Sequence, residues 1–170
     1  MRLIKLTAFG SLILAGLVML SSCEREAEEK KTYLYAKSGI VMSSAQETPA
    51  VNSSALGSLD VSYSKETKLL NYKVTWTGLS DSVSAMHIHG LAPISYAAGV
   101  VQNIVAASNS IYPQKTSGKF TYAKTGTLSG TMLVDGNVVK EEDLLNGMYY
   151  VNIHTSVFPA GEIRGQIKFQ

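Results

Sequence analysis

The sequence is short of cysteine, of excess charge and of long apolar runs, and each shortage excludes a class of protein. Its single cysteine, Cys23, cannot form an intramolecular disulfide, so the fold must be held by its core. After residue 20 no apolar stretch approaches the roughly 20 residues that span a membrane. Nucleophile-elbow, P-loop, dinucleotide-binding and Cys-x-x-Cys motifs are missing as well. The sequence therefore favours a non-enzymatic protein over an enzyme.

The first 22 residues have the layout of a signal peptide. A cationic start precedes an apolar run over residues 6–20, and Ser21 and Ser22 then lead to Cys23. This ending resembles the lipobox of bacterial lipoproteins, in which the cysteine is diacylated and the preceding peptide is removed. The resemblance implies a lipid on Cys23 that holds the protein on the extracytoplasmic side of a membrane, the outer membrane being the expected one. A secretory signal that is cut elsewhere is the alternative.

Residues 23–32 are expected to form a charged tether between this anchor and a domain over residues 33–170. The tether has no apolar periodicity, which is typical of a solvated spacer. Acidic residues behind a lipidated cysteine also resemble the surface-export signals of lipoproteins in some Gram-negative groups. A plain spacer and a signal for exposure at the cell surface both remain open.

The mature chain is expected to be electrically neutral. Loss of Arg2 and Lys5 with the signal peptide reduces the 15 basic residues to 13, which equals the number of acidic residues. We therefore expect no nucleic-acid partner. The expected contacts are the membrane, through the lipid on Cys23, and an unknown protein or small ligand, with the protein itself a monomer.

The domain has the composition of strands and turns, rich in Val, Ile, Thr and Tyr, with Gly, Ser and Asn at the breaks. Residues 70–77 alternate most clearly between apolar and polar side chains, which indicates a half-buried strand. A short helix is expected near residues 140–146. Further strands are predicted at residues 33–42, 59–63, 86–89, 100–105, 119–134, 148–155 and 162–169. The pattern predicts an all-β fold, a single antiparallel Greek-key-like sandwich or closed barrel of about seven to nine strands.

The three histidines of the chain are placed so that they share a face. His87 and His89 are two residues apart, so a strand points both imidazoles to the same side. His154 follows Asn152 with the same spacing, while the residues between them are apolar. Polar side chains from two separate strands are therefore predicted to face outward.

The last two strands are expected to form a hairpin, because residues 156–160 are few enough for a tight connection. A register that puts Asn152 opposite Arg164 also puts His154 opposite Glu162, and all four side chains then share the outward face.

Histidines in this arrangement are candidate ligands of a Zn or Cu ion, because imidazole binds both metals. His87, His89 and His154 would be the ligands, and Glu162 would orient a ligand or act as a fourth one. No other cofactor is expected. The His-x-His pair also resembles the copper ligands of copper/zinc superoxide dismutases, although the larger ligand set and the disulfide of that family are missing here. The alternative is a structural network in which the imidazoles hydrogen-bond to Glu162, Asn152 and backbone groups.

Several segments also resemble, in order, the CHRD domain, which is named after chordin and is also found in bacterial secreted and envelope proteins. They are residues 44–51, 69–79, 85–90, 142–147 and 150–166. The resemblance implies a module with no established catalytic activity, which serves in binding or structure. It adds Gln46 and Glu47 to the polar face formed by the histidines, Glu162 and Arg164. The chain departs from the family pattern at residues 91–93 and over residues 95–114. The loop over residues 91–99 is expected to be a flexible lip beside the polar face.

Overall fold

The structure is a computed structural model that describes residues 33–105 and 123–170. Cys23, the expected signal peptide and the tether lie outside the described residues. Residues 35–170 belong to one compact unit. No helix in the described part of the chain is long and apolar enough to cross a membrane.

The domain is all-β, as predicted, with eight antiparallel strands and two short helical segments. The strands are β1 (Leu34–Ser43), β2 (Leu56–Ser64), β3 (Leu69–Thr77), β4 (Val83–Gly90), β5 (Val100–Val105), β6 (Gly126–Leu133), β7 (Tyr149–Thr155) and β8 (Ile163–Gln166). The helical segments are the 3-10 turn η1 (Ser44–Gln46) and the helix α2 (Glu141–Leu145). The turn η1 was not predicted. Strand β6 covers part of the strand expected over residues 119–134, of which residues 119–122 lie outside the described part of the chain.

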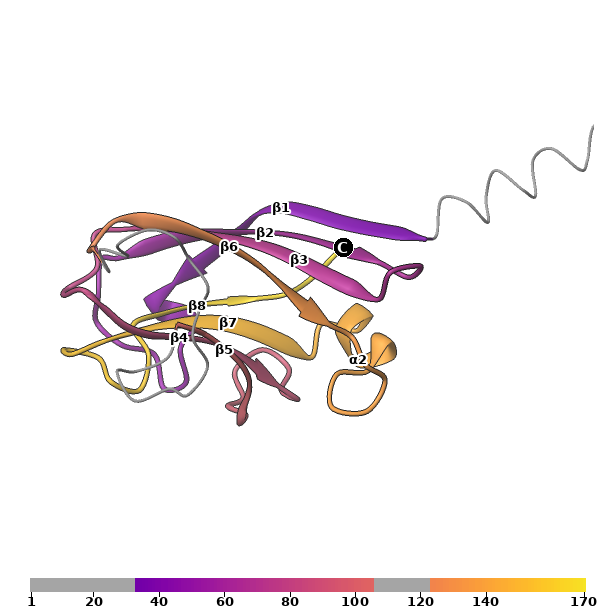
Figure 1. Ribbon diagram of the computed structural model, residues 1–170. Coiled ribbons are helices and arrows are strands. Elements are labelled where there is room, and N and C mark those ends of the chain that lie inside the picture. Colours follow the sequence, from indigo (N-terminus) through magenta and orange to yellow (C-terminus); the bar gives the residue numbers. More distant parts are fainter. Residues whose placement is uncertain (1–32, 106–122) are drawn as a thin grey trace, which may run out of the picture. The chain divides into compact units, whose positions relative to one another are not determined.

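The strands form one sheet in the order β5-β4-β7-β8-β1-β2-β3-β6, which curls into a nearly closed barrel. Figure 1 shows β1, β2, β3 and β6 in one layer and β4, β5, β7 and β8 in the other. Strand β6 returns to pair with β3 after β4 and β5 have been placed in the opposite layer, which gives Greek-key-like connectivity. The two edge strands are bridged by Gln102 of β5, whose Nε2 donates to the Thr131 carbonyl of β6 at 3.0 Å.

Alternating apolar residues build the core between the layers. On β3 the inward residues Leu70, Tyr72, Val74 and Trp76 are buried, while the residues between them are exposed. Partners on the other layer include Ile88, Val151 and Ile153, none of which is exposed at all. The short helix α2 carries three acidic residues in its first turn, where the helix dipole favours negative charge. Gly147 follows this helix with φ +72°, a left-handed stop that suits glycine.

Candidate functional site

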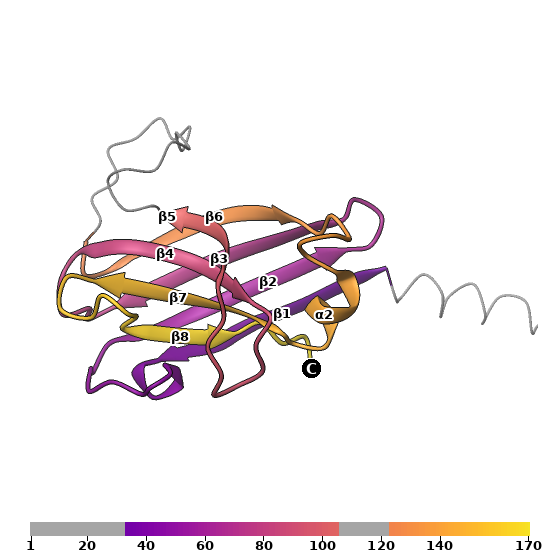
Figure 2. The same cartoon turned by 90° about the horizontal axis from the view of Figure 1, so that it is seen from below.

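The histidine-bearing strands lie side by side in the sheet, with β7 between β4 and β8 (Figure 2). Across these strands His87 is level with Asn152, and Asn152 is level with Arg164. The predicted register of the last hairpin is therefore confirmed at this pair. His154 lies beside Asn152 on β7 and pairs with Ala85 of β4.

A second row of paired residues on the same face runs across the three strands and consists of His89, Tyr150 and Gln166. Tyr150 and Gln166 were not singled out as site residues from the sequence. The available signal was their spacing of two from Asn152 and Arg164, which puts them on the same face. Their functional placement depends on neighbours from other strands, which the sequence alone does not pair.

The polar face points away from the core between the layers, as predicted, and is nevertheless buried. Asn152 and Arg164 are each 2% exposed, His89 is 8% exposed and His154 is 9% exposed. Two segments from elsewhere in the chain cover them. One is the loop over residues 91–99, which we call the strap, and the other begins with Glu47, directly after η1.

The strap is tied to the face below it by several hydrogen bonds, although a flexible lip was expected here. Arg164 donates to the carbonyl oxygens of Tyr96 at 2.8 Å and Pro93 at 3.3 Å. Gln166 donates to the Ala92 carbonyl at 2.9 Å. These donors lie at the centre of the polar face, so the same residues hold the strap and fill the site.

Two of the imidazoles have a fixed orientation. Nδ1 of His89 lies 2.9 Å from the Ala98 carbonyl oxygen, and Nδ1 of His154 lies 3.0 Å from the Pro159 carbonyl oxygen. A carbonyl can only accept, so each Nδ1 carries the hydrogen. In the neutral ring, Nε2 of each histidine then presents a lone pair.

These lone pairs point to one place. Nε2 of His89 and Nε2 of His154 are each 3.0 Å from Oδ1 of Asn152. Nδ1 of His87 is also 3.0 Å from Nε2 of His154. One nitrogen from each of the three rings lies within 4.8 Å of the others. The face can therefore direct three imidazoles at a single small ligand.

Burial keeps the rings of His87 and His154 neutral. Burial, together with the neighbouring His154 and His89 rings, lowers the pKa of His87 to about 4. Burial also lowers the pKa of His154, although its contact with the Pro159 carbonyl acts in the opposite direction. Neutral imidazole is the form that binds metal ions, and it predominates here at neutral pH.

Glu47 lies on the other side of Asn152 and is 9% exposed. Its Oε1 has no hydrogen-bond partner among the described residues. Burial raises the pKa of Glu47 to about 7, although Arg164 and a hydrogen bond with Asn152 act against the rise. A Cβ on Gly161 would lie within 2.4 Å of Oε1, so the close approach of this carboxyl requires glycine at that position.

Arg164 and His89 both contact the ring of Tyr150. The guanidinium carbon of Arg164 lies 3.4 Å from the centre of that ring, a cation–π contact. The His89 ring is nearly parallel to the Tyr150 ring, with an angle of 3° and centroids 4.8 Å apart. Stacking of this kind fixes the plane of the His89 imidazole.

Glu162 does not join the histidines, although the register predicted from the sequence places it opposite His154. Its carboxylate accepts hydrogen bonds from Thr155 at 2.7 Å, Ser53 at 2.7 Å and Ser80 at 2.7 Å. Burial would raise the pKa of this group, but these hydrogen bonds hold it below its usual range. Gln46 also lies apart from the imidazoles and donates to the Val41 carbonyl at 2.8 Å.

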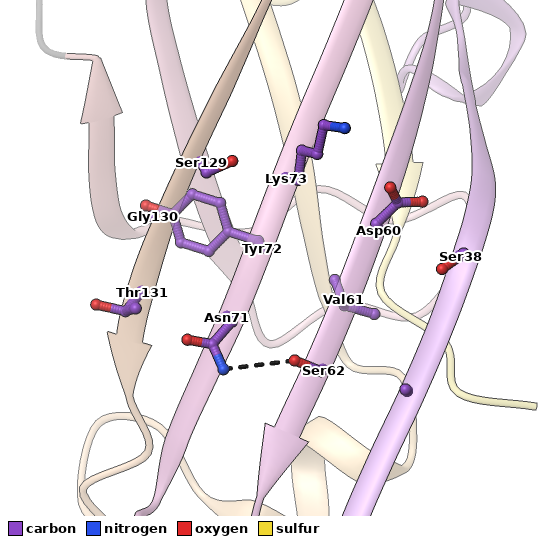
Figure 3. Close-up of a pocket in the computed structure, with 11 residues that line it drawn as sticks. Ser38, Asp60, Val61, Ser62, Asn71, Tyr72, Lys73, Ser129, Gly130 and Thr131 are labelled. Atoms are coloured by element: carbon purple, nitrogen blue, oxygen red, sulfur yellow. Dashed lines mark hydrogen bonds between the residues drawn. The ribbon is translucent and has the colours of Figure 1, made fainter.

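A second polar surface, on the opposite layer, is open to solvent. Figure 3 shows its hollow over β2, β3 and β6, with Lys73 of β3 beside Asp60 of β2 and Asn71 of β3 beside Ser62 of β2. The side chains make few contacts with each other, for example the 3.4 Å hydrogen bond from Asn71 to Ser62. This surface offers the exposed ammonium and amide groups of Lys73 and Asn71 and the half-buried carboxylate of Asp60.

Comparison with known proteins gave one family. Residues 39–167 match the family model described as the CHRD domain. This range contains every polar side chain of the buried face and all residues of the strap. Comparisons with curated proteins and with solved structures gave no match.

Proposed function

This chain belongs to the CHRD domain family, and we propose that it is a non-catalytic binding module, exported and held at a membrane by a lipid on Cys23. The strap is the feature that carries this proposal. Its outer side presents Leu91 and Ile94, each 52% exposed, and Tyr96, which is 66% exposed. Large apolar side chains gathered on one short exposed segment are typical of interaction surfaces.

The strap is also preformed for binding. Its backbone is held by Arg164 and Gln166, and its Ala98 amide donates to the hydroxyl of Tyr150 at 3.2 Å. Ordering a loop on binding costs free energy, and a loop that is already fixed avoids most of that cost. The buried hydrogen bonds therefore support a role in recognition for the exposed side chains above them.

The two carboxyl groups nearest the polar face favour a non-catalytic role. Glu162 is completely buried and its oxygens are occupied by hydroxyl groups of the protein. Glu47 is almost as buried. A general acid or base must come within hydrogen-bond reach of a substrate, which neither position allows in this conformation.

The anchor in this proposal is supported by the sequence. An apolar run followed by Ser21, Ser22 and Cys23 meets the requirements of lipoprotein processing. The charged residues 24–31 would then hold the domain away from the membrane surface, in reach of partners outside it.

The anchor is tested by labelling cells with radioactive palmitate and fractionating their membranes. The wild-type chain should carry the label and remain with the membranes, because diacylation adds apolar chains that stay in the bilayer. Cys23→Ala should lose the label and be released. Retention of the label by this variant would show that the lipid is not on Cys23.

The binding role is tested by placing a photo-crosslinking amino acid at Tyr96 or, as a matched control, at Val138. Both positions are 66% exposed, but Val138 lies outside the strap, between β6 and α2. In intact cells the probe at position 96 should give a discrete crosslinked product that the probe at position 138 does not give. Identical products from both positions, or none from position 96, would contradict a binding surface on the strap.

A further inference from the structure

We propose that His87, His89 and His154 bind one divalent transition-metal ion, Zn(II) or Cu(II), which is a function beyond the binding role of the strap. Each ring contributes one nitrogen, and these nitrogens lie within 4.8 Å of one another. Neutral imidazole is a donor that both ions favour.

The orientation of two rings is that of metal ligands. A histidine that binds a metal almost always donates its other ring N–H to a carboxylate, a backbone carbonyl or water. His89 and His154 do this through Nδ1, to the carbonyls of Ala98 and Pro159. Their Nε2 atoms therefore carry the lone pairs, that of His154 facing Nδ1 of His87, and stacking on Tyr150 holds the plane of the His89 ring.

The centre of the cluster has an excess of acceptors. Oδ1 of Asn152 lies 3.0 Å from Nε2 of His89 and 3.0 Å from Nε2 of His154. With both rings neutral, three lone-pair atoms face one another in a buried place, an arrangement that is repulsive. A cation at this point makes all of these contacts favourable. Without a metal, the Asn152 carboxamide relieves the repulsion only by turning its NH2 group toward the two rings.

The spacing of the three imidazole nitrogens is close to the spacing that a metal ion requires. Zn–N bonds of about 2.0–2.1 Å at tetrahedral angles place ligand nitrogens about 3.3 Å apart. The pairs seen here are at most 4.8 Å apart, so a shift of roughly 1.5 Å completes the site. His87 is the least buried of the three histidines and already lies 3.0 Å from His154. Three ligands leave a fourth position for water or an added ligand.

The charges around the cluster tolerate a divalent ion. Arg164 is separated from His89 by the ring of Tyr150, which it contacts from the β8 side of β7. Glu47, on the far side of Asn152, supplies a carboxyl group to the same neighbourhood. His87 is the partly exposed member and gives the ion a way in from solvent.

The experiment uses the full chain with Cys23→Ser, which removes its only thiol, purified in detergent without a His-tag or chelator. Calorimetric titration with Zn(II) and with Cu(II) should give one ion per chain and a higher melting temperature, because the ion binds the native state preferentially. The chain has three histidines in all, so imidazole nitrogen couplings in the electron paramagnetic resonance spectrum of the Cu(II) form report these rings alone.

His87→Gln is the decisive variant, because the only hydrogen bond recorded for its ring in the described residues is the one to His154. It should fold and bind the ion more than about 100-fold more weakly, since loss of a ligand's supporting partner alone costs about 10–100-fold. Lys73→Gln, on the open surface, should bind like the parent protein.

Unchanged binding by His87→Gln would overturn the metal site. So would less than about a tenth of an equivalent of either ion bound to the folded parent protein with no change in melting temperature. These outcomes would leave a structural hydrogen-bond network as the role of the three histidines. Crosslinking from the strap is measured separately in cells, so failure of the metal site and failure of the binding role remain distinguishable.

Discussion

Strands β3 and β7 alternate between two faces in the same way, but their surroundings are opposite. On β3 the outward residues Asn71, Lys73 and Thr75 are exposed. On β7 every residue is buried, including the outward Asn152 and His154. The difference lies in what covers each strand, because the strap and the segment at Glu47 lie over β7, while the outer side of β3 forms an open hollow.

Covering a polar face changes what its side chains must do. A hydrated side chain satisfies its hydrogen bonds with water, whereas a buried one costs free energy unless the protein supplies a partner. Arg164 therefore donates to Tyr96, Pro93 and Gln166, and most of the buried face is linked in the same way. The two surfaces should consequently respond very differently to equivalent substitutions.

The largest contrast is expected between Arg164→Ala and Lys73→Ala. Loss of Arg164 removes the donor to the Tyr96 carbonyl, one donor to the Pro93 carbonyl and a side chain that is only 2% exposed, and should lower the free energy of unfolding by about 3–5 kcal/mol. Lys73 is solvated, and its removal should change that free energy by less than about 0.5 kcal/mol. Urea unfolding followed by circular dichroism measures both values. Equal effects would mean that the covered face is no more tightly bound than the open one.

A pH-dependent contrast is expected from Glu47 in the metal-free protein. Its pKa is raised from 4.5 to about 7 in the folded state, so this carboxyl keeps a proton that the unfolded chain releases between those values. Its stabilising contribution is present below pH 4.5 and is lost as the pH rises through 7. Between pH 4.5 and 8 the wild type should lose about 2–3 kcal/mol relative to Glu47→Gln. Parallel stability curves for the two proteins would show that Glu47 titrates normally.

A smaller effect is expected for His154→Ala in the metal-free protein. The substitution removes the donor to the Pro159 carbonyl and the acceptor opposite His87. It should lower the free energy of unfolding by about 1–3 kcal/mol, because buried polar groups lose their partners. Thermal unfolding in the presence of a chelator measures this loss. A folded variant of wild-type stability would indicate that water replaces the imidazole.

The smallest effect is expected on the open surface, where the hydroxyls of Thr75 and Thr127 are 3.2 Å apart across β3 and β6. A double-mutant cycle with Thr75→Ala and Thr127→Ala should give a coupling free energy below about 0.5 kcal/mol, since water competes for both hydroxyls. The same cycle on Asn152 and His154 should give a larger coupling. Similar values would remove the distinction between the two faces.

Much of the fold was predictable, because the signals that specify strands are local. Alternation places Tyr72 and Val74 in the core without knowledge of any partner strand. The short connection after β7 allows few registers, and the predicted pairing of Asn152 with Arg164 is confirmed. The short helix was expected near residues 140–146 and is found at Glu141–Leu145.

The site was predictable only in part. The sequence predicted that His87, His89 and His154 share one face, and the structure places His154 of β7 at hydrogen-bond distance from His87. Glu162 was expected beside His154, but the hydroxyls of Thr155, Ser53 and Ser80 hold its carboxylate elsewhere. Both serines lie more than 80 residues from Glu162 in sequence, so no local pattern indicates these contacts.

The sequence by itself determined the strands of this protein, the face of the sheet to which each side chain points and the register of the last hairpin. All three depend on period-two alternation and short connections. The tertiary structure decided that one polar face is covered and the other is open. It did so by laying the strap and Glu47 over β7, through contacts such as that between Arg164 and Tyr96, 68 residues apart. Alternation fixes which way a side chain points, but what covers it depends on segments that meet only when the chain has folded.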